Sequence, residues 1–142
     1  MDSSLEYILM CEKAWPHLTT VFDFKDVVFS PSQQALCRTF YKQDPESGVL
    51  KPVFIRMDGV DLVEADDFFI VWQVHQLRDM IAESGVTYSQ YETLRDSSPF
   101  LKYLPKENDG NLLENGLLLA LILYERYGKA WTGQDWVDVK KG

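Results

Sequence analysis

Residues 66–85, DDFFIVWQVHQLRDMIAESG, decide the fold, because no other stretch joins so much apolar bulk to such clear end signals. One stripe at helical spacing holds four aliphatic side chains: Ile70, Val74, Leu77 and Ile81. Asp66 or Asp67 can cap the start of a helix, and Ser84-Gly85 can end it. Strand alternation would instead place Phe68, Ile70, Trp72 and Val74 on one face. We expect a helix over the whole stretch, with a strand over its first half as the alternative.

Upstream of this stretch, the sequence predicts a β-hairpin at about residues 34–58. Residues 38–41 are β-prone, and apolar positions alternate along residues 49–56. The connector 44–48, DPESG, has Pro45 to preset φ and Gly48 for a left-handed position. A helix over 31–42 is the alternative, because Ser30 and Gln33 have capping-box spacing around a proline at the first helical position.

Helical patterns account for most of the remaining chain. Residues 3–15 form one pattern that Pro16 should stop, residues 87–95 form a second, and residues 111–127, closed by Gly128, form the clearest one. With the central stretch, these three patterns make four helices, and a short helix over 17–24 would be the fifth. The expected fold is therefore α+β: a small antiparallel β-sheet, with its hairpin at about 34–58, packed against four to five helices in a single domain of residues 1–142.

Charge is the most informative part of the composition. The net charge of −8 repels phosphate backbones, so direct nucleic-acid binding is not expected and a basic protein is the natural complement. Residues 44–67 contain only Lys51 and Arg56 as bases against seven acids: Asp44, Glu46, Asp58, Asp61, Glu64, Asp66 and Asp67. These acids predict either a docking surface or a solvated acidic loop.

One segment runs against this acidic character. Residues 38–42, RTFYK, interleave aromatic and basic side chains, a pattern found in proteins that bind single-stranded RNA. A single such segment on an acidic chain is weak support for RNA binding, so we expect Arg38 and Lys42 to balance neighbouring acids.

Cysteine usage and apolar runs indicate a cytoplasmic protein. Cys11 and Cys37 are far apart and have apolar neighbours, which suits buried reduced thiols better than a disulfide framework. The longest apolar run, residues 117–124, is far shorter than the roughly 20 residues of a membrane-spanning helix. The N-terminus has acids where a secretory signal needs positive charge. We expect no membrane association.

The residues that could perform catalysis do not form a recognisable motif. Only His17 and His75 could act as a histidine base, and on a helix His75 would lie one turn from Asp79. The acids of residues 58–67 lack the spacing of a calcium loop, and neither phosphate-binding glycine motif occurs. We therefore assign no catalytic residue, no metal ligand and no cofactor.

These observations favour a small acidic binding protein without catalytic activity. The main hypothesis is an inhibitor that neutralises a basic partner, either a toxin or a nucleic-acid-binding effector, through the seven acids of residues 44–67, with Tyr41 and Trp131 as aromatic anchors. Trp131 and Trp136 also indicate that the C-terminal segment docks on the body of the protein. The alternative is a structural or adaptor subunit that assembles as a homodimer through helix 111–127, and the third is an enzyme using carboxylates. As an inhibitor, the chain is expected to be a monomer or a homodimer.

Overall fold

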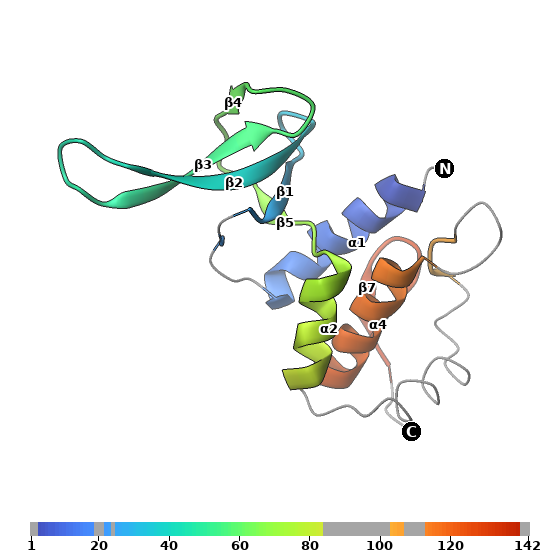
Figure 1. Cartoon of the computed structure of the whole chain (residues 1–142). Helices are drawn as coiled ribbons and strands as arrows, with labels where there is room; N and C mark the ends of the chain where they lie inside the picture. The colour runs from blue at the N-terminus through green and yellow to red at the C-terminus, as the bar shows by residue number, and fades with distance from the viewer. Residues whose placement is uncertain (1–2, 19–21, 24, 84–102, 107–112, 140–142) are drawn as a thin grey trace. The chain divides into compact units, whose positions relative to one another are not determined.

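The computed structural model describes residues 3–18, 22–23, 25–83, 103–106 and 113–139 (Figure 1). It divides the chain into a helical unit, residues 1–14 and 72–142, and a sheet unit, residues 15–71. Chain order gives helix α1 (Ser3–Leu18), strands β1 (Val27–Ser30), β2 (Ala35–Gln43), β3 (Leu50–Arg56), β4 (Leu62–Val63) and β5 (Phe69–Ile70), helices α2 (Val74–Glu83) and α4 (Glu114–Tyr127), and strands β6 (Lys129–Trp131) and β7 (Trp136–Asp138).

The fold is α+β, but the prediction of four to five helices is wrong. The described ranges contain three helices, and the pattern at 87–95 lies outside those ranges. Residues 22 and 23 are not helical. The chain there leads into a strand pairing instead, because the Lys25 N–H donates to the Thr39 carbonyl at 2.7 Å. Residues 17 and 18 belong to the end of α1, so the separate helix predicted over 17–24 is absent from the part of that range that the structure describes.

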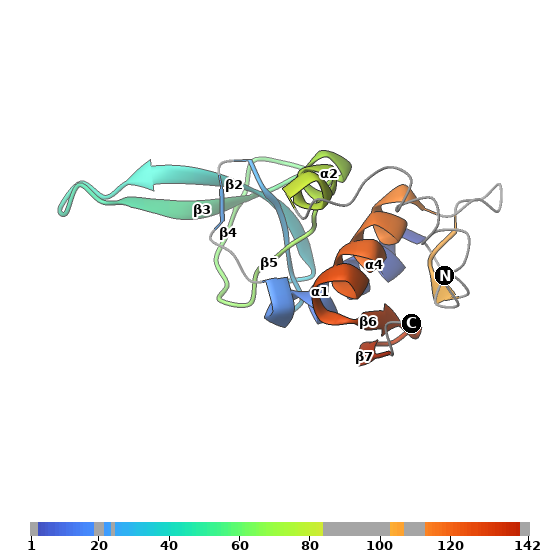
Figure 2. The same ribbon diagram turned by 90° about the horizontal axis from the view of Figure 1, so that it is seen from below.

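The sheet unit contains a five-stranded antiparallel sheet in the order β4-β3-β2-β1-β5. Its longest pair is the hairpin predicted at 34–58, which projects as a ribbon beyond the other strands (Figure 2). Gly48 in the connecting turn has φ +70°, a conformation that glycine adopts at little cost. A helix over 31–42 is excluded, because β2 forms ladders with both β1 and β3, and these pairings outweigh the local capping signal.

Strand alternation gives the sheet a buried face and an outer face. The buried face of β2 consists of Ala35, Cys37 and Thr39. The register places the following side chains on the opposite side, which we call the outer face: Leu36, Arg38, Phe40, Lys42, Lys51, Val53 and Ile55. The link from β4 to β5 crosses the buried face, because the ring of Phe68 stacks on that of Phe54 with centroids 4.0 Å apart.

The central stretch, residues 66–85, is not one helix. Phe69 and Ile70 pair with β1, and helix α2 begins only at Val74. The side chain of Gln76 accepts a hydrogen bond from the Gln73 N–H at 2.8 Å, so the helix start is capped there instead of at Asp66 or Asp67. The β-prone first half of the stretch pairs with β1, and the helical spacing of nearby residues gives no sign of this distant pairing.

Helix α1 passes the proline that was predicted to stop it. Pro16 lies inside α1, which ends at Leu18. A proline in the last turn of a helix removes only one backbone donor, and Leu18 is buried at 5% exposure. Burial of Leu18 therefore offsets the lost hydrogen bond.

Helix α4 is the core of the helical unit. It ends where predicted, at Gly128, whose φ of 64° is left-handed, and residues 116–123 are all buried. Its surroundings include α2, strand β6 and Met10 of α1. The predicted start at Asn111 lies outside the described residues. No helix within the described ranges is long and apolar enough to cross a membrane.

Two hydrogen bonds to backbone carbonyls join distant segments inside this unit. The Tyr7 hydroxyl donates to the Trp72 carbonyl at 2.6 Å, and Trp136 Nε1 donates to the Met10 carbonyl at 3.1 Å. The second bond, with the packing of Trp131 on Trp136 at a centroid separation of 5.1 Å, confirms that the C-terminal segment docks. Each buried polar group here is satisfied, which avoids a desolvation penalty.

We expect Gly116→Ala to destabilise the protein. In most helices this change stabilises by about 1 kcal/mol, but a Cβ at Gly116 would lie 3.0 Å from Cγ and 3.2 Å from Cδ of the Pro105 ring. The stiff ring cannot move aside without disturbing its neighbours, so we expect a net loss of about 1–2 kcal/mol in the free energy of unfolding. Urea denaturation measures it. Gly59→Ala, with open space around its Cβ, is the control, and a more stable Gly116→Ala would show that this contact relaxes.

We also expect neither cysteine to react in the native protein. Both thiols are free and buried, and burial raises the pKa of Cys37 above its usual value and that of Cys11 to about 12. A disulfide-exchange reagent at neutral pH should label both only after unfolding in guanidinium. Rapid labelling of the native protein would contradict this, and Cys11→Ala and Cys37→Ala would identify the reacting thiol.

Candidate binding surface

Asp44 is a structural residue of the β2–β3 turn. Its carboxylate accepts hydrogen bonds from the Glu46 N–H at 3.0 Å and the Ser47 hydroxyl at 3.1 Å, and Lys51 Nζ lies 3.5 Å away. The hydrogen bond from the Glu46 backbone is the main reason why the pKa of Asp44 is lowered. Asp44 therefore shapes the hairpin tip, whereas the adjacent Glu46 side chain is exposed.

Asp67 has a structural role in a different turn. It accepts hydrogen bonds from the Ser30 hydroxyl at 2.5 Å and the Ser32 N–H at 2.7 Å, which joins the β1–β2 turn to the segment before β5. The Ser30 hydroxyl contributes most to the lowered pKa of this carboxyl group. Asp67 is thus already engaged within the sheet unit.

The other acids of residues 58–66 are exposed. Asp58 and Asp61 lie in the β3–β4 turn, where Arg56 Nε is 3.8 Å from the Asp58 carboxylate. Glu64 and Asp66 lie in the link between β4 and β5. The side chains of Asp61, Glu64 and Asp66 form no ion pair with the described residues, so these three are free to meet a partner.

The structure does not gather the seven acids into one cluster. Asp44 and Glu46 lie at the end of the hairpin where β3 begins, and Asp58 and Asp61 lie at the other end of that strand. Seven residues of extended chain separate these groups by roughly 20 Å. The predicted acidic site is therefore divided along the length of β3.

The two predicted aromatic anchors differ in exposure. Tyr41 is 38% exposed, and its hydroxyl donates to the carbonyl of Phe22. Trp131 is only 2% exposed in the helical unit, where it packs on Trp136. Trp131 therefore offers no accessible surface to a partner in this structure.

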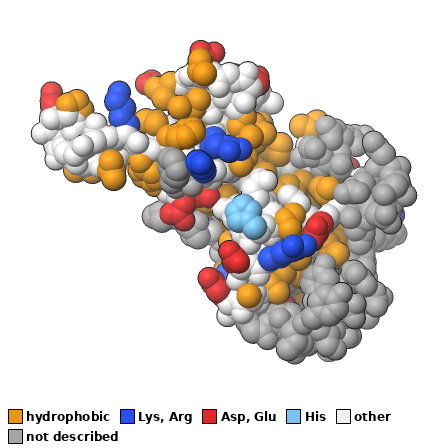
Figure 3. Space-filling view, viewed as in Figure 1, with side chains coloured by type: hydrophobic (Ala, Val, Ile, Leu, Met, Phe, Trp, Pro, Cys, Tyr) orange, Lys and Arg blue, Asp and Glu red, His pale blue; other side chains and the backbone are white. Residues whose placement is uncertain are grey.

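Exposed apolar side chains gather on the sheet unit. More than half of the large hydrophobic residues that are exposed among the described ranges lie between positions 41 and 62. They are Tyr41, Val49, Leu50, Met57, Val60 and Leu62. Figure 3 shows hydrophobic and cationic side chains side by side over this region, with acidic side chains at the hairpin tip and along the upper margin.

A groove of about 360 Å³ lies at one end of the outer face. Arg38, Phe40 and Ile55 are on the outer face, and Met57 and Val60 come from the β3–β4 turn. Arg56 also borders the groove, but it is paired with Cys37, so alternation places its side chain toward the buried face. The sequence interpretation of residues 38–42 as charge balance missed this groove. Period-two alternation along a strand puts Arg38 and Phe40 on one face, and that signal was available in the sequence, but only the fold shows the turn that lies beside them.

The edge of the sheet beside β3 is protected against pairing with another strand. The Arg56 N–H donates to Asp61, away from β2, whereas the Met57 N–H donates to Leu36 of β2. The direction of the backbone N–H alternates from residue to residue along an antiparallel strand. The backbone nitrogen of Pro52 therefore points away from β2, as that of Arg56 does. β4 covers only Phe54 and Ile55, and the uncovered part contains Pro52, which has no N–H. Binding through side chains of the outer face is therefore favoured over strand addition.

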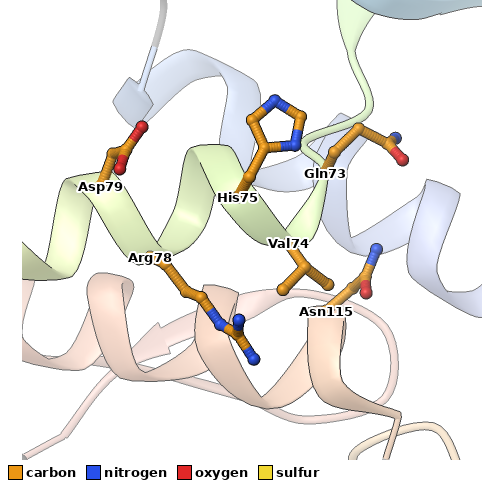
Figure 4. Close-up of a pocket in the computed structure, with 6 residues that line it drawn as sticks. All are labelled: Gln73, Val74, His75, Arg78, Asp79 and Asn115. Atoms are coloured by element: carbon orange, nitrogen blue, oxygen red, sulfur yellow. The ribbon is translucent and has the colours of Figure 1, made fainter.

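A second hollow, of about 530 Å³, lies at the start of α2. Figure 4 shows His75 and Asp79 on the side of α2 that faces away from α4, at the one-turn spacing predicted. Arg78 points toward α4, where it pairs with the carboxylate of Glu114. Among the described residues, no group of three or more His, Cys, Asp or Glu side chains could hold a metal ion.

Asp67→Asn should destabilise the protein near neutral pH by roughly 1 kcal/mol, because Asn is a weaker acceptor for the Ser30 and Ser32 donors. Since folding lowers the pKa of Asp67, its contribution is present above the unfolded-state pKa and is lost as pH falls through the folded-state pKa. The difference between wild type and Asp67→Asn should therefore shrink in acid. Thermal melts from neutral to acidic pH test this, with exposed Asp66→Asn as the control, and a pH-independent difference would contradict it.

Comparison with known proteins gives this chain no relatives from which a function could be transferred. No family model matches its sequence, and no curated protein or solved structure matches it either. Its function has to be inferred from its own residues and geometry.

Proposed function

We propose that this chain is a small binding protein without catalytic activity, which neutralises a basic protein partner such as a toxin or a nucleic-acid-binding effector. The observation that carries the proposal is the exposed apolar group of Met57, Val60 and Leu62 at the β3–β4 end of the sheet. It lies beside the exposed carboxylates of Asp61, Glu64 and Asp66, which form no ion pair with the described residues. The sheet unit is the binding region in this proposal.

This combination has the properties of a protein interface. Apolar side chains in the centre of an interface provide affinity, whereas charges at its rim mainly steer encounter and select partners. A net charge of −8 attracts cationic proteins and repels nucleic acids. An inhibitor with such a surface would compete for the cationic face with which an effector binds its own anionic ligand.

The adaptor hypothesis has less support. It required an exposed leucine surface on helix 111–127, but residues 116–123 of α4 are buried by the chain itself. The carboxylate-enzyme hypothesis also has less support, because Asp44 and Asp67 hold turns and the remaining acids are spread along the sheet.

The proposed location is the cytoplasm. Both cysteines are free and buried, which is typical of proteins in a reducing compartment.

Neutralising Asp61, Glu64 and Asp66 together, as Asp61→Asn, Glu64→Gln and Asp66→Asn, should weaken capture of the basic partner about tenfold at low salt, because steering depends on rim charge. The fold should be unchanged, since these side chains hold no turn. Wild type and variant would be immobilised and exposed to lysate of the native host at low and high salt, with captured proteins identified by mass spectrometry.

A matched variant, Glu6→Gln with Asp79→Asn and Glu83→Gln, removes the same number of charges from the helical unit. It should capture the partner nearly as well as wild type. Equal capture by all three proteins would refute the role of these acids, and a salt-resistant assembly would favour the adaptor hypothesis.

A further inference from the structure

The hairpin exposes apolar surface at both of its ends. At the tip, Val49 and Leu50 are 56% and 62% exposed. At the groove, Val60 is 90% exposed and Met57 is 43% exposed. Apolar surface of this kind is stabilised when another surface covers it.

The groove has a defined chemical preference. Its apolar lining lies beside Arg38, which shares the outer face with Phe40 and Ile55. Arg38 forms no ion pair with the described residues. A matching ligand therefore combines an aliphatic side chain with a carboxylate.

The tip of the same hairpin has this chemistry. Continuing the alternation of β3 places Val49 on the side of the outer face, and Asp44 and Glu46 stand in the adjacent turn. The carboxylate of Glu46 has no partner among the described residues. Tip and groove thus complement each other in both apolarity and charge.

We propose that the occupant of the groove is the hairpin tip of a second copy of this chain. Tip and groove lie on one hairpin and are separated by roughly 20 Å along β2, too far to meet within one sheet unit. In this dimer the outer faces of the two hairpins pack against each other, and the β2 strands of the two copies run in opposite directions. Each tip then lies over the groove of the other copy. This arrangement is a two-fold contact, in which the same surface is used on both copies.

The register of β2 determines which charges meet in this dimer. A two-fold axis near Tyr41 lies midway between Arg38 and Asp44, so the two positions exchange across the axis. Arg38 then faces the carboxylates of the second copy's tip. Lys42 then lies over the strand position of the second copy's Phe40, whereas Lys51 stays beside the carboxylate of Asp44 in its own tip, 3.5 Å away.

The contact should be weak. Each copy contributes a single two-stranded ribbon with one pair of opposite charges at each end, so we expect a dissociation constant in the micromolar range. Pro52 disfavours the alternative of joining two sheets edge to edge along β3. Both contacts include the apolar surface of Met57 and Val60, but the dimer depends on the charges of Arg38 and Glu46 and the basic partner on those of Asp61, Glu64 and Asp66. Variants of these two sets of charges therefore let the two inferences fail separately.

Sedimentation velocity over a concentration series tests the dimer. Wild type should pass from monomer to dimer as concentration rises through the micromolar range. Arg38→Glu alone and Glu46→Arg alone should remain monomeric, because each places like charges together at both symmetric contacts. The double variant Arg38→Glu/Glu46→Arg should dimerise again, and so should an equimolar mixture of the two single variants.

Two control variants distinguish loss of the dimer contact from loss of the fold and from a change in net charge. Lys13→Glu makes the same change in charge as Arg38→Glu but lies in the helical unit, so it should dimerise like wild type. Val60→Ser, at a 90% exposed position that packing does not require, should weaken the dimer while preserving the circular dichroism spectrum. A wild type that is monomeric at every concentration, or single charge variants that dimerise like wild type, would overturn the proposal.

Discussion

The burial of helix α4 over residues 116–123 is the constraint from which the helical unit follows. A helix that is apolar around most of its circumference must be covered from several directions. Met10 of α1, helix α2 and strand β6 provide that cover. Close approach to Pro105 also explains the glycine at position 116, where a larger side chain has no room.

Covering α4 removes some polar groups from water. In the helical unit, these groups form hydrogen bonds with segments that are distant in the sequence. The hydroxyl of Tyr7 and the indole of Trp136 each reach a backbone carbonyl in another segment. These bonds contribute less net free energy than the burial itself, but leaving either group unpaired would cost about 1–3 kcal/mol. They therefore select one arrangement of the buried segments.

The sheet unit is governed by a different constraint, the period-two alternation of its strands. One face is closed by Phe68 stacked on Phe54, while the outer face keeps apolar and cationic side chains in contact with solvent. Turn residues then decide where the acids lie. Asp44 and Asp67 hold their turns, whereas Asp61, Glu64 and Asp66 are exposed and form no ion pair with the described residues. A surface that combines free carboxylates with exposed aliphatic side chains is suited to binding another protein.

The sequence by itself determined the features that depend on neighbouring residues. The β2–β3 hairpin follows from alternation around DPESG, the end of α4 from Gly128, and the buried reduced thiols from their apolar context. Only the tertiary structure decided that residues 69–70 form a strand, because their partner in β1 lies about forty positions away in the chain. It also decided that Trp131 is buried, that the seven acids are divided between the ends of β3, and that a groove lies beside Phe40 and Ile55. Each of these outcomes depends on which distant segments pack together, and local spacing contains no information about that choice.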